Sequence, residues 1–455
     1  MKFSKVLVAP LAIGTLAVLV ALAGCSKGGE SAALKKPTTL RYVLWDANQL
    51  PQYQAVADKF HEKYPNITIK IEQTGWSNYW TNLQTEFVSG TAPDVFTDHL
   101  FYYPEFEANH QLVNIEPMVK RDNVPTDIYF GGLAQLWMHD GKRYGLPKDW
   151  DTEAMFYNKD MTKKAGITDE QMNNLTWNPE NGGTFQKVAA MLTLDANGNN
   201  GLSPTFDKSK VSQYGFITDY PGGANAQGQT TWACFAVSTG WWYNNAPVWG
   251  TKFNFDSPDF ANTIQWYANM NLKYGYSPSY ADLSNGPDSL FVAGKGAIEE
   301  EGDWQLKFIA EHAKFPVGIA LLPKGPSGNF RTMFNGLADS IWTGSKNQAA
   351  AWEWVKFLAS KESETLVGTY GDVYPAVPAG AEKSVAVQKE KLHVNPQAFL
   401  TEANTKGATF PFPITLHSSK VNQIMQTALQ AVFTGQKTAD QVVGPANDQI
   451  NQLFQ

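Results

Sequence analysis

A strand, a helix and a second strand follow one another near the start of the chain, and this order constrains the fold most. Residues 67–72 alternate strictly between apolar and polar side chains, which is the period of a half-buried strand. Residues 38–46 have the pattern of an earlier buried strand. Between them, apolar residues recur at helical spacing from Tyr53 to Tyr64, and Pro65 ends the pattern. Because strands joined by a helix usually pair in parallel, we predict a doubly wound α/β sheet.

The first residues have the charge and hydropathy order of an export signal. Two lysines precede an apolar run over residues 6–22, and small residues then lead to Cys25, whose thiol can carry a diacylglycerol. We therefore predict that residues 1–24 are a lipoprotein signal peptide and that Cys25 is lipidated. Residues 25–37 are then a flexible tether. The alternative is a single membrane-spanning helix, since the run is nearly long enough for one.

Charge and composition restrict the classes of function. Removal of the two signal-peptide lysines takes the formal charge from -7 to -9, which disfavours nucleic acid and phosphate ligands. A neutral or cationic ligand fits better. The chain has 2 cysteines, so lipidation of Cys25 leaves Cys234 without a disulfide partner. The 15 tryptophans stand beside 18 tyrosines and 26 phenylalanines, and sugar rings stack well on such flat apolar faces.

Seven short segments occur in a specific order along the chain. They are FHEKYP at 60–65, GTAPDV at 90–95, YGLP at 144–147, MFYNKD at 155–160, FVAGKGA at 291–297, GDW at 302–304, and AAWEW at 350–354 continuing to 358. Together they resemble the extracellular solute-binding proteins of ATP-driven (ABC) importers, in the sugar-binding branch that includes maltose-binding protein. Singly each segment is a weak signal, whereas their order is specific.

The resemblance implies a two-lobed α/β protein in which each lobe is a mostly parallel sheet flanked by helices. The ligand cleft is expected between the lobes, which close around the ligand like a hinged clamp. It places the N-terminal lobe at residues 38–148 and 318–352, and the C-terminal lobe at 149–317 and 353–455. The expected partners are a carbohydrate ligand, the transmembrane subunits of an ABC permease, and the membrane through the lipid anchor. We expect a monomer on the extracytoplasmic face that is not an enzyme and requires no cofactor.

Ligands of open α/β sheets lie beyond the carboxyl ends of the strands. Trp45 and Asp46 follow the first predicted strand, Trp76 follows the second, and Asp98 follows the third. An aromatic plate beside a carboxylate suits a sugar, because the ring stacks and paired hydroxyls find a charged acceptor. Two alternatives stay open, since Trp45 would also fit a core and Asp98 would also cap the next helix.

The second lobe carries an aromatic stretch over residues 231–249. We predict that Trp232 and at least one of Trp241 and Trp242 line the cleft, with Trp249 structural. By resemblance, Trp304 lies against a sugar ring beside Asp303. Trp150 and Asp151 lie at a probable lobe crossing, facing the cleft or buried under the hinge, and three further residues resemble segments that reach the ligand. The complete predicted set is Trp45, Asp46, Trp76, Asp98, Trp150, Asp151, Trp232, Trp241, Trp242, Asp303, Trp304, Asn335, Gly336 and Tyr374.

Three rival functions remain. A carbohydrate-active enzyme needs two carboxylates that flank the glycosidic bond to be cleaved. The acidic residues at 149–153 and 299–303 could supply them, but no recognisable catalytic motif surrounds these residues. A metal-capturing lipoprotein is disfavoured because the 7 histidines form no close pair. A binding lipoprotein for a peptide or another solute is the main alternative.

The loop from Asp195 to Gly201 resembles the start of an EF-hand calcium loop, with oxygen ligands at alternate positions. Asn200 replaces the expected glycine, and Phe206 takes the place of the final bidentate glutamate. An Asn-Gly turn without any ion is the alternative. If a structural calcium binds here, the expected ligands are Asp195, Asn197, Asn199, Gly201 and Asp207.

Overall fold

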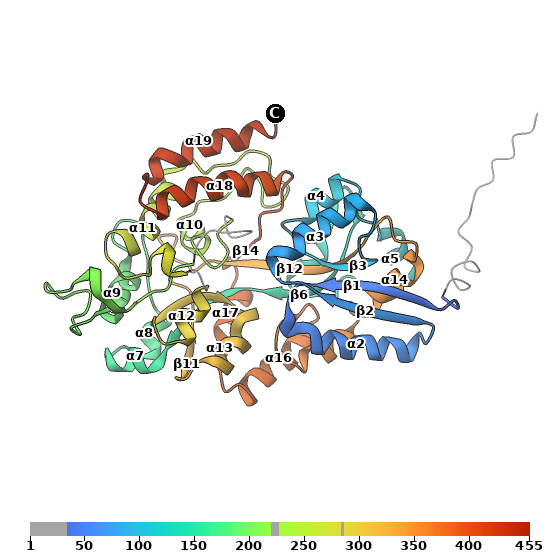
Figure 1. The fold of residues 1–455 in the computed structure, drawn as a ribbon, viewed down its shortest axis with the longest axis horizontal. Coiled ribbons are helices and arrows are strands. Elements are labelled where there is room, and N and C mark those ends of the chain that lie inside the picture. The colour runs from blue at the N-terminus through green and yellow to red at the C-terminus, as the bar shows by residue number, and fades with distance from the viewer. Residues whose placement is uncertain (1–33, 220–226, 284–285) are drawn as a thin grey trace, which may run out of the picture.

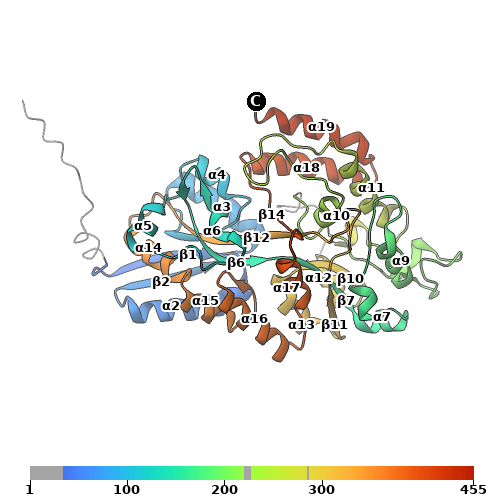
Figure 2. The same ribbon diagram turned by 180° about the vertical axis from the view of Figure 1, so that it is seen from behind.

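The computed structural model describes residues 34–219, 227–283 and 286–455, so the predicted signal peptide, Cys25 and most of the tether lie outside the described residues. Within these ranges the chain forms two α/β lobes side by side (Figure 1), and the reverse view shows the same division (Figure 2). None of the described helices combines the length and the apolar character that a bilayer span needs. The expected two-lobed α/β architecture is confirmed.

The first lobe is built on a seven-stranded sheet with the order β13-β6-β12-β3-β1-β2, and β14 pairs with β12. β1 runs parallel to β2 and β3, whereas β12 runs antiparallel to β3 and β6. The strands are β1 (Thr38–Leu44), β2 (Ile67–Gln73), β3 (Val95–Asp98), β6 (Leu146–Asp151), β12 (Thr332–Ile341), β13 (Tyr374–Pro375) and β14 (Thr409–Pro411). The predicted strand, helix, strand order is therefore present, and its strands are parallel neighbours.

Helix signals in the sequence coincide with the observed ends. α2 (Leu50–Lys63) has Pro51 in its first turn and buries Val56 and Phe60 against the sheet. α3 (Trp76–Ser89) ends at Gly90, whose φ of 71° is the left-handed conformation that glycine adopts readily. The other helices of this lobe are α4 (Tyr103–Ala108), α5 (Glu116–Asp122), α6 (Leu133–Leu136), α14 (Gln348–Leu358), α15 (Lys361–Gly368) and α16 (Pro378–Glu390). α2 and α3 cover opposite faces of the sheet (Figure 1).

The second lobe has a smaller sheet with the order β10-β7-β11, formed by β10 (Ile298–Gly302), β7 (Glu153–Asn158) and β11 (Val317–Ala320). Both outer strands are antiparallel to β7, so the prediction of a mostly parallel sheet is wrong for this lobe. Neighbouring strands of this sheet come from distant segments of the chain and are not joined by the strand–helix–strand units that favour parallel pairing. Helices make up most of this lobe: α7 (Lys159–Lys164), α8 (Asp169–Met172), α9 (Gly183–Leu192), α10 (Ala233–Ser238), α11 (Pro258–Leu272), α12 (Pro287–Val292), α13 (Leu306–His312), α17 (Gln397–Asn404), α18 (Ser418–Phe433) and α19 (Ala439–Gln452). A long loop separates β8 (Leu194–Asp195) from β9 (Val211–Gln213), and the two strands pair antiparallel. In the first lobe, a short hairpin joins β4 (Met138–His139) to β5 (Lys142–Arg143).

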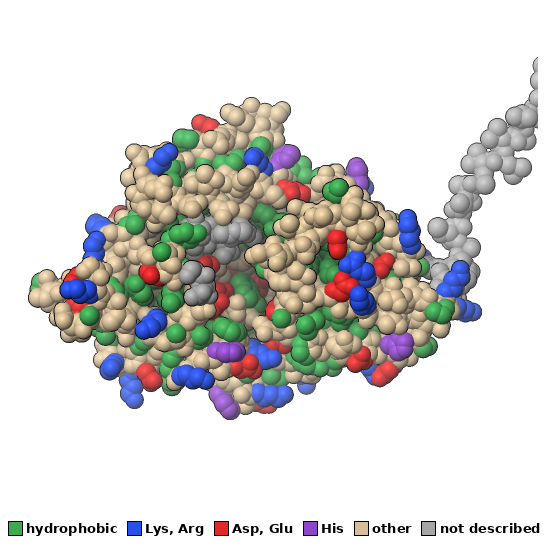
Figure 3. Space-filling model, in the orientation of Figure 1, with side chains coloured by type: hydrophobic (Ala, Val, Ile, Leu, Met, Phe, Trp, Pro, Cys, Tyr) green, Lys and Arg blue, Asp and Glu red, His purple; other side chains and the backbone are tan. Residues whose placement is uncertain are grey.

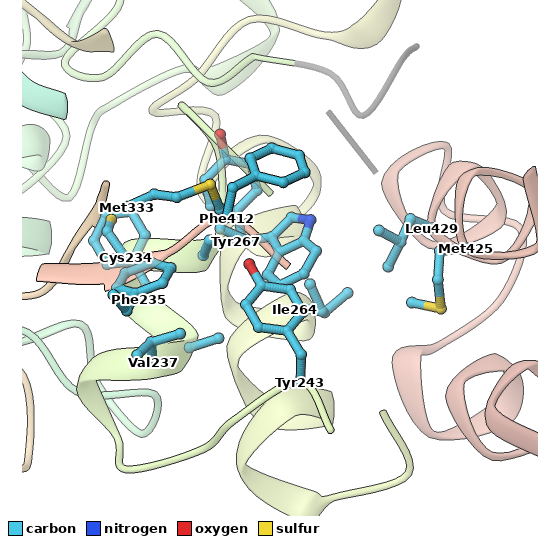
Figure 4. Packing of buried hydrophobic residues seen from close by; sticks show 14 of the residues in the cluster. Cys234, Phe235, Val237, Tyr243, Ile264, Tyr267, Met333, Phe412, Met425 and Leu429 are labelled. Atoms are coloured by element: carbon cyan, nitrogen blue, oxygen red, sulfur yellow. The ribbon is translucent and has the colours of Figure 1, made fainter. Parts of the chain in front are cut away.

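The core of the second lobe joins α10, α11 and α18. Figure 4 shows Phe235 of α10 near Met333 of β12, with Tyr267 and Ile264 of α11 in the middle of the cluster and Met425 and Leu429 of α18 at its other side. Cys234 is a free, buried cysteine within the same cluster. This apolar cluster includes Met333 near the start of β12, whereas the end of β12 pairs with β3 of the first sheet. The strand is therefore held by one lobe at its start and by the other at its end.

The chain passes between the lobes at three places among the described residues, and β14, between α17 and α18, stays at the border, where it pairs with the first residues of β12. β6 of the first sheet runs directly into β7 of the second, β11 is followed by β12, and α16 is followed by α17. Two expected borders differ from this packing. β11 belongs to the second sheet, so the predicted border at residue 318 falls inside a strand. The second lobe was expected to resume at residue 353, but α15 and α16 pack with α2 and β13 of the first lobe. The second lobe resumes at α17, which contacts β7 and β11.

Candidate ligand-binding cleft

A cavity of about 480 Å³ opens where the lobes meet. Figure 3 shows the surface hollowed at this place. The carboxyl ends of β1, β2 and β3 all reach it, through Trp45, Gln73 and His99. The second lobe contributes residues after β10, and β6 and β12 form the floor between the lobes. This is the position that the topology of an open parallel sheet favours for a ligand.

The wall of the first lobe is aromatic. Trp45 and Trp76 meet edge to face with their ring centroids 5.1 Å apart, and Trp45 also packs on Tyr79 and Trp80 at 5.3 Å. Trp45 and Trp76 are half-buried and line the cavity, while Tyr79 and Trp80 are buried behind them. Because these edge-to-face contacts hold both rings in place, their exposed faces are ordered before a ligand arrives.

Trp304 stands on the second lobe, in the short helix η6 (Asp303–Gln305) that follows β10. Its ring lies so close over Gly302 that a Cβ there would be 2.0 Å from a ring carbon. A glycine two residues before the tryptophan is therefore required for the ring to lie in this position. One face of the Trp304 indole is therefore presented to the cavity, while the other face packs on the backbone of Gly302.

Carboxyl groups gather at the crossing between the lobes. Asp151 accepts hydrogen bonds from the side-chain amides of Gln229, at 2.9 Å, and Asn335, at 3.2 Å. Asp303 accepts one from the backbone N–H of Thr152 at 3.2 Å. Burial raises the pKa of Asp151 well above its usual value, and the charge of Asp303 adds to the shift. A carboxyl group that keeps its proton can donate as well as accept hydrogen bonds, which suits hydroxyl ligands.

Asp149 of β6 carries an unsatisfied acceptor on the cavity floor. It is 3% exposed, lines the cavity, and its Oδ2 has no hydrogen-bond partner among the described residues. Burial raises its pKa to about 6. His99 lies nearby, with Nδ1 accepting from the backbone N–H of Phe101 and Nε2 2.9 Å from the amide nitrogen of Asn335. Burial lowers the pKa of His99 to about 3, so its ring is neutral.

The cavity is strongly acidic. Seven carboxyl groups line it, and no lysine or arginine occurs among the described lining residues. Lys148 is close but lies behind the wall, where its Nζ donates to Gln49 at 3.1 Å and lies 4.2 Å from the ring centre of Tyr53. Anionic ligands are therefore disfavoured, because nothing in the described lining offers a positive charge. The seven acidic residues are Asp46, Asp149, Asp151, Asp219, Asp288, Glu301 and Asp303.

The structure brings eight of the fourteen predicted ligand residues into the cavity lining. They are Trp45, Asp46, Trp76, Trp150, Asp151, Asp303, Trp304 and Asn335. Trp150 is only 2% exposed and packs on Phe130 at 4.9 Å and Tyr374 at 4.9 Å, so it supports the floor more than it offers a face. Asp46 also caps the short helix η1 (Ala47–Gln49) through the N–H of Asn48.

The prediction that Trp232, Trp241 and Trp242 line the cleft differs from the structure. Trp232 is fully buried, with its ring 4.9 Å from Phe260 of α11. Trp241 stacks on the same phenylalanine at 4.8 Å, and Trp242 donates to the backbone carbonyl of Ala246. None of the three lines the cavity. The aromatic stretch packs against α11 because that helix offers a large apolar face within the same lobe.

Asp98, Gly336 and Tyr374 also lie outside the cavity lining. Asp98 is fully buried and accepts from Ser340 Oγ at 3.2 Å, while the next residue, His99, reaches the cavity instead. Gly336 gives room to Leu133, which would lie 2.3 Å from an added Cβ. Tyr374 points away and donates to Gln388 at 3.0 Å, so that Val373 lines the cavity in its place.

The sequence reasoning missed several lining residues. Asp149 and Leu337 are two residues away from predicted ones on the same strands, so strand alternation would have indicated them. His99 directly follows a predicted residue. Gln229, Thr230 and Asp288 come from loops and a short helix with no local signal of cavity position. The other missed lining residues are Ala47, Asn48, Gln49, Gln73, Asp219, Pro287, Glu301, Gln305 and Val373.

The predicted calcium loop is organised by its own hydrogen bonds. Asp195 Oδ1 accepts from the backbone N–H groups of Asn197 and Asn199, both at 2.9 Å. Its Oδ2 accepts from the Asn199 side chain and from the N–H of Asp207, both at 3.0 Å. Four donors therefore satisfy the carboxylate that was expected to hold the ion. Calcium at this loop stays a prediction, and the bonds favour the Asn-Gly turn.

A family model described as bacterial extracellular solute-binding protein matches residues 46–365. The galactooligosaccharide-binding protein of Bacillus subtilis is 26% identical over 451 residues, which cover 95% of this chain and 95% of that protein. The maltodextrin-binding protein MdxE of the same organism is 24% identical over 84% of this chain and 83% of its own length. An ABC substrate-binding protein from Listeria monocytogenes in complex with cycloalternan superposes with a TM-score of 0.77 at 18% identity, covering 92% of this chain and 99% of that one.

Proposed function

Because the chain belongs to the bacterial extracellular solute-binding proteins, we propose that it captures a carbohydrate, an oligosaccharide, and delivers it to the permease of an ABC importer. The observation that carries the proposal is the pair of aromatic walls facing one cavity. Trp45 and Trp76 stand on the first lobe and Trp304 on the second, with carboxyl groups between them. Sugar rings need such a combination, since their C–H faces stack and their hydroxyls seek acceptors.

The size and position of the cavity support a ligand held between two moving bodies. Its volume of about 480 Å³ lies within the range of about 300–1,000 Å³ that is common for small-molecule sites. The lobes are joined by three chain passages, and Asp151 at the β6–β7 passage bonds to Gln229 of the second lobe. A ligand that contacts both walls favours the closed arrangement of the two lobes.

We also propose that the protein is attached to the membrane through its first residues. The lipid anchor on Cys25 would hold the folded body on the extracytoplasmic face, and the tether would let it reach the permease. A monomer suffices for this task, because the cavity is formed by residues of one chain. Lipidation, the anchor and the monomeric state are parts of the proposal.

A panel of oligosaccharides tests the proposal directly. The purified protein is screened by thermal shift against linear, branched and cyclic oligosaccharides, with a peptide mixture as the control. A ligand present at 100 times its Kd adds about 2.7 kcal/mol to the free energy of unfolding. Positive sugars are then titrated calorimetrically and assayed for reducing ends. Binding without product supports a receptor, release of reducing ends indicates an enzyme, and a response to peptides alone would refute carbohydrate capture.

A further inference from the structure

A second cluster of acidic side chains lies at the edge of the cavity. Glu299 and Glu301 are two residues apart on β10, so their side chains leave the strand on the same face. Asp288, in the first turn of α12, packs onto that face. One carboxylate oxygen from each of the three residues lies within 4.8 Å of the other two. The strand alternation and the covering helix thus bring three negative groups to one point.

These carboxyl groups lack the partners that buried acidic residues normally have. Glu299 is 1% exposed, and no N–H or hydroxyl group among the described residues donates a hydrogen bond to either of its oxygens, so that its neighbour is the carboxyl group of Asp288. Oδ1 of Asp288 also receives no hydrogen bond from such a group. Glu301 accepts a hydrogen bond from the N–H of Gly302 at 2.7 Å. An unpaired buried carboxylate is costly, so the cluster must take up either protons or a cation.

The geometry distinguishes a bare ion from a charged group of the transported ligand. Asp288 and Glu301 line the cavity, whereas Glu299 lies behind them and outside the lining. A group that contacts all three carboxylates must therefore reach behind the cavity lining. A small ion can do so more easily than an ammonium group that is attached to a sugar. Oxygens that share one calcium ion at 2.3–2.6 Å lie at most about 5 Å apart, in agreement with the observed limit of 4.8 Å.

We propose that Asp288, Glu299 and Glu301 bind a hard divalent cation such as calcium beside the cavity. Their ligand atoms are all oxygens, which calcium prefers, and backbone carbonyls and water complete the six to eight ligands that it takes. The cation offsets the three negative charges, two of which are buried, and ties α12 to β10. This site is separate from the loop at Asp195, and it does not depend on which solute the protein carries.

The test measures metal binding by the full processed chain in the absence of any sugar. The protein is stripped with EDTA, exchanged into metal-free buffer and titrated with calcium by calorimetry, with magnesium and manganese in parallel. Terbium, with luminescence excited through nearby tryptophans, gives an independent signal. We expect one ion per chain and a higher melting temperature in its presence. The proposal is overturned if the wild-type protein binds none of these ions.

Variants assign the ion to the cluster. Glu299→Gln keeps the shape of the side chain but removes its charge, and should weaken binding by at least about tenfold, as even changes behind a metal ligand often do. Glu300→Gln is the matched control, since Glu300 is 3% exposed on the same strand but faces the other way. Asp195→Asn tests the competing loop. Both controls should bind the ion as the wild type does.

Two results would overturn the assignment. Loss of binding in Asp195→Asn with retention in Glu299→Gln would place the ion in the Asp195 loop instead. Equal affinity of the wild type and Glu299→Gln for the cation would show that Glu299 is not one of its ligands. If circular dichroism shows that Glu299→Gln does not fold, Asp288→Asn serves in its place, because Asp288 is half-buried on a short helix and its loss should disturb the core less.

Discussion

Replacement of Trp304 by alanine should weaken carbohydrate binding without unfolding the protein. One face of its indole is held by Gly302, so a ligand can cover only the face toward the cavity. A tryptophan presents about 150–250 Å² in total. If a sugar covers about 80 Å² of it, the loss at about 25 cal/mol per Å² is about 2 kcal/mol. That corresponds to a Kd about 30-fold higher, since 1.4 kcal/mol is a factor of ten.

Calorimetric titration with a sugar identified by the thermal-shift screen measures the change. Trp242→Ala is the matched control, because Trp242 is also half-buried and on the second lobe but does not line the cavity. It should lower the melting temperature and leave the Kd within about twofold of the wild type, a difference of about 0.4 kcal/mol. Circular dichroism establishes that both variants are folded. An unchanged Kd in Trp304→Ala, or an equal loss in Trp242→Ala, would refute the stacking role.

Four further predictions concern single residues. Asp149→Asn should raise the melting temperature at pH 7.5. Burial raises the pKa of Asp149 in the folded protein from 3.8 to about 6, so the wild-type protein loses stability as the pH rises from about 4 to about 6. The variant should not show this loss, and the same pH dependence of stability in both proteins would contradict the prediction. Gly302→Ala should weaken sugar binding, because its Cβ would lie 2.0 Å from the ring of Trp304; calorimetry showing wild-type affinity would mean that the ring position is unimportant. Asp195→Ala should lower the melting temperature equally in calcium and in EDTA, since four N–H donors lose their acceptor, whereas a loss seen only in calcium would make this loop a metal site. Cys25→Ala should leave the precursor uncleaved and without lipid by mass spectrometry, and normal lipidation of that variant would disprove the anchor.

Local patterns were sufficient for the first strands and helices of the first lobe, β1 to β3 with α2 and α3. The alternation over residues 67–72, the helical spacing before Pro65 and the glycine at position 90 each report a conformation set by neighbours in the chain. Because ligands gather beyond the ends of parallel strands, the same patterns also indicated Trp45, Asp46 and Trp76. The segments resembling a known family supplied the two lobes and Trp304, which no periodicity indicates.

The error of one residue at Asp98 shows where local reasoning ends. Asp98 is the last residue of β3 and His99 directly follows it, and their order in the sequence does not say which side chain turns toward the second lobe. The antiparallel neighbour β12 decides it, since Ser340 binds Asp98 in the interior and Asn335 lies beside His99 at the cavity. These partners are more than 230 residues away in the chain, at separations of 242 and 236.

The sequence by itself determined the first strands and helices and the acidic and aromatic composition, because each depends on residues close together in the chain. The export signal stays a prediction from the same kind of local pattern. Only the tertiary structure decided which aromatic rings face the cavity and which carboxyl groups meet. Trp232 and Trp304 are the same residue type, yet α11 buries the first, whereas Gly302 holds the second at the cavity wall. Glu299 and Asp288 converge only when α12 packs on β10. Burial and convergence arise from contacts between distant segments, and no pattern along the chain encodes them alone.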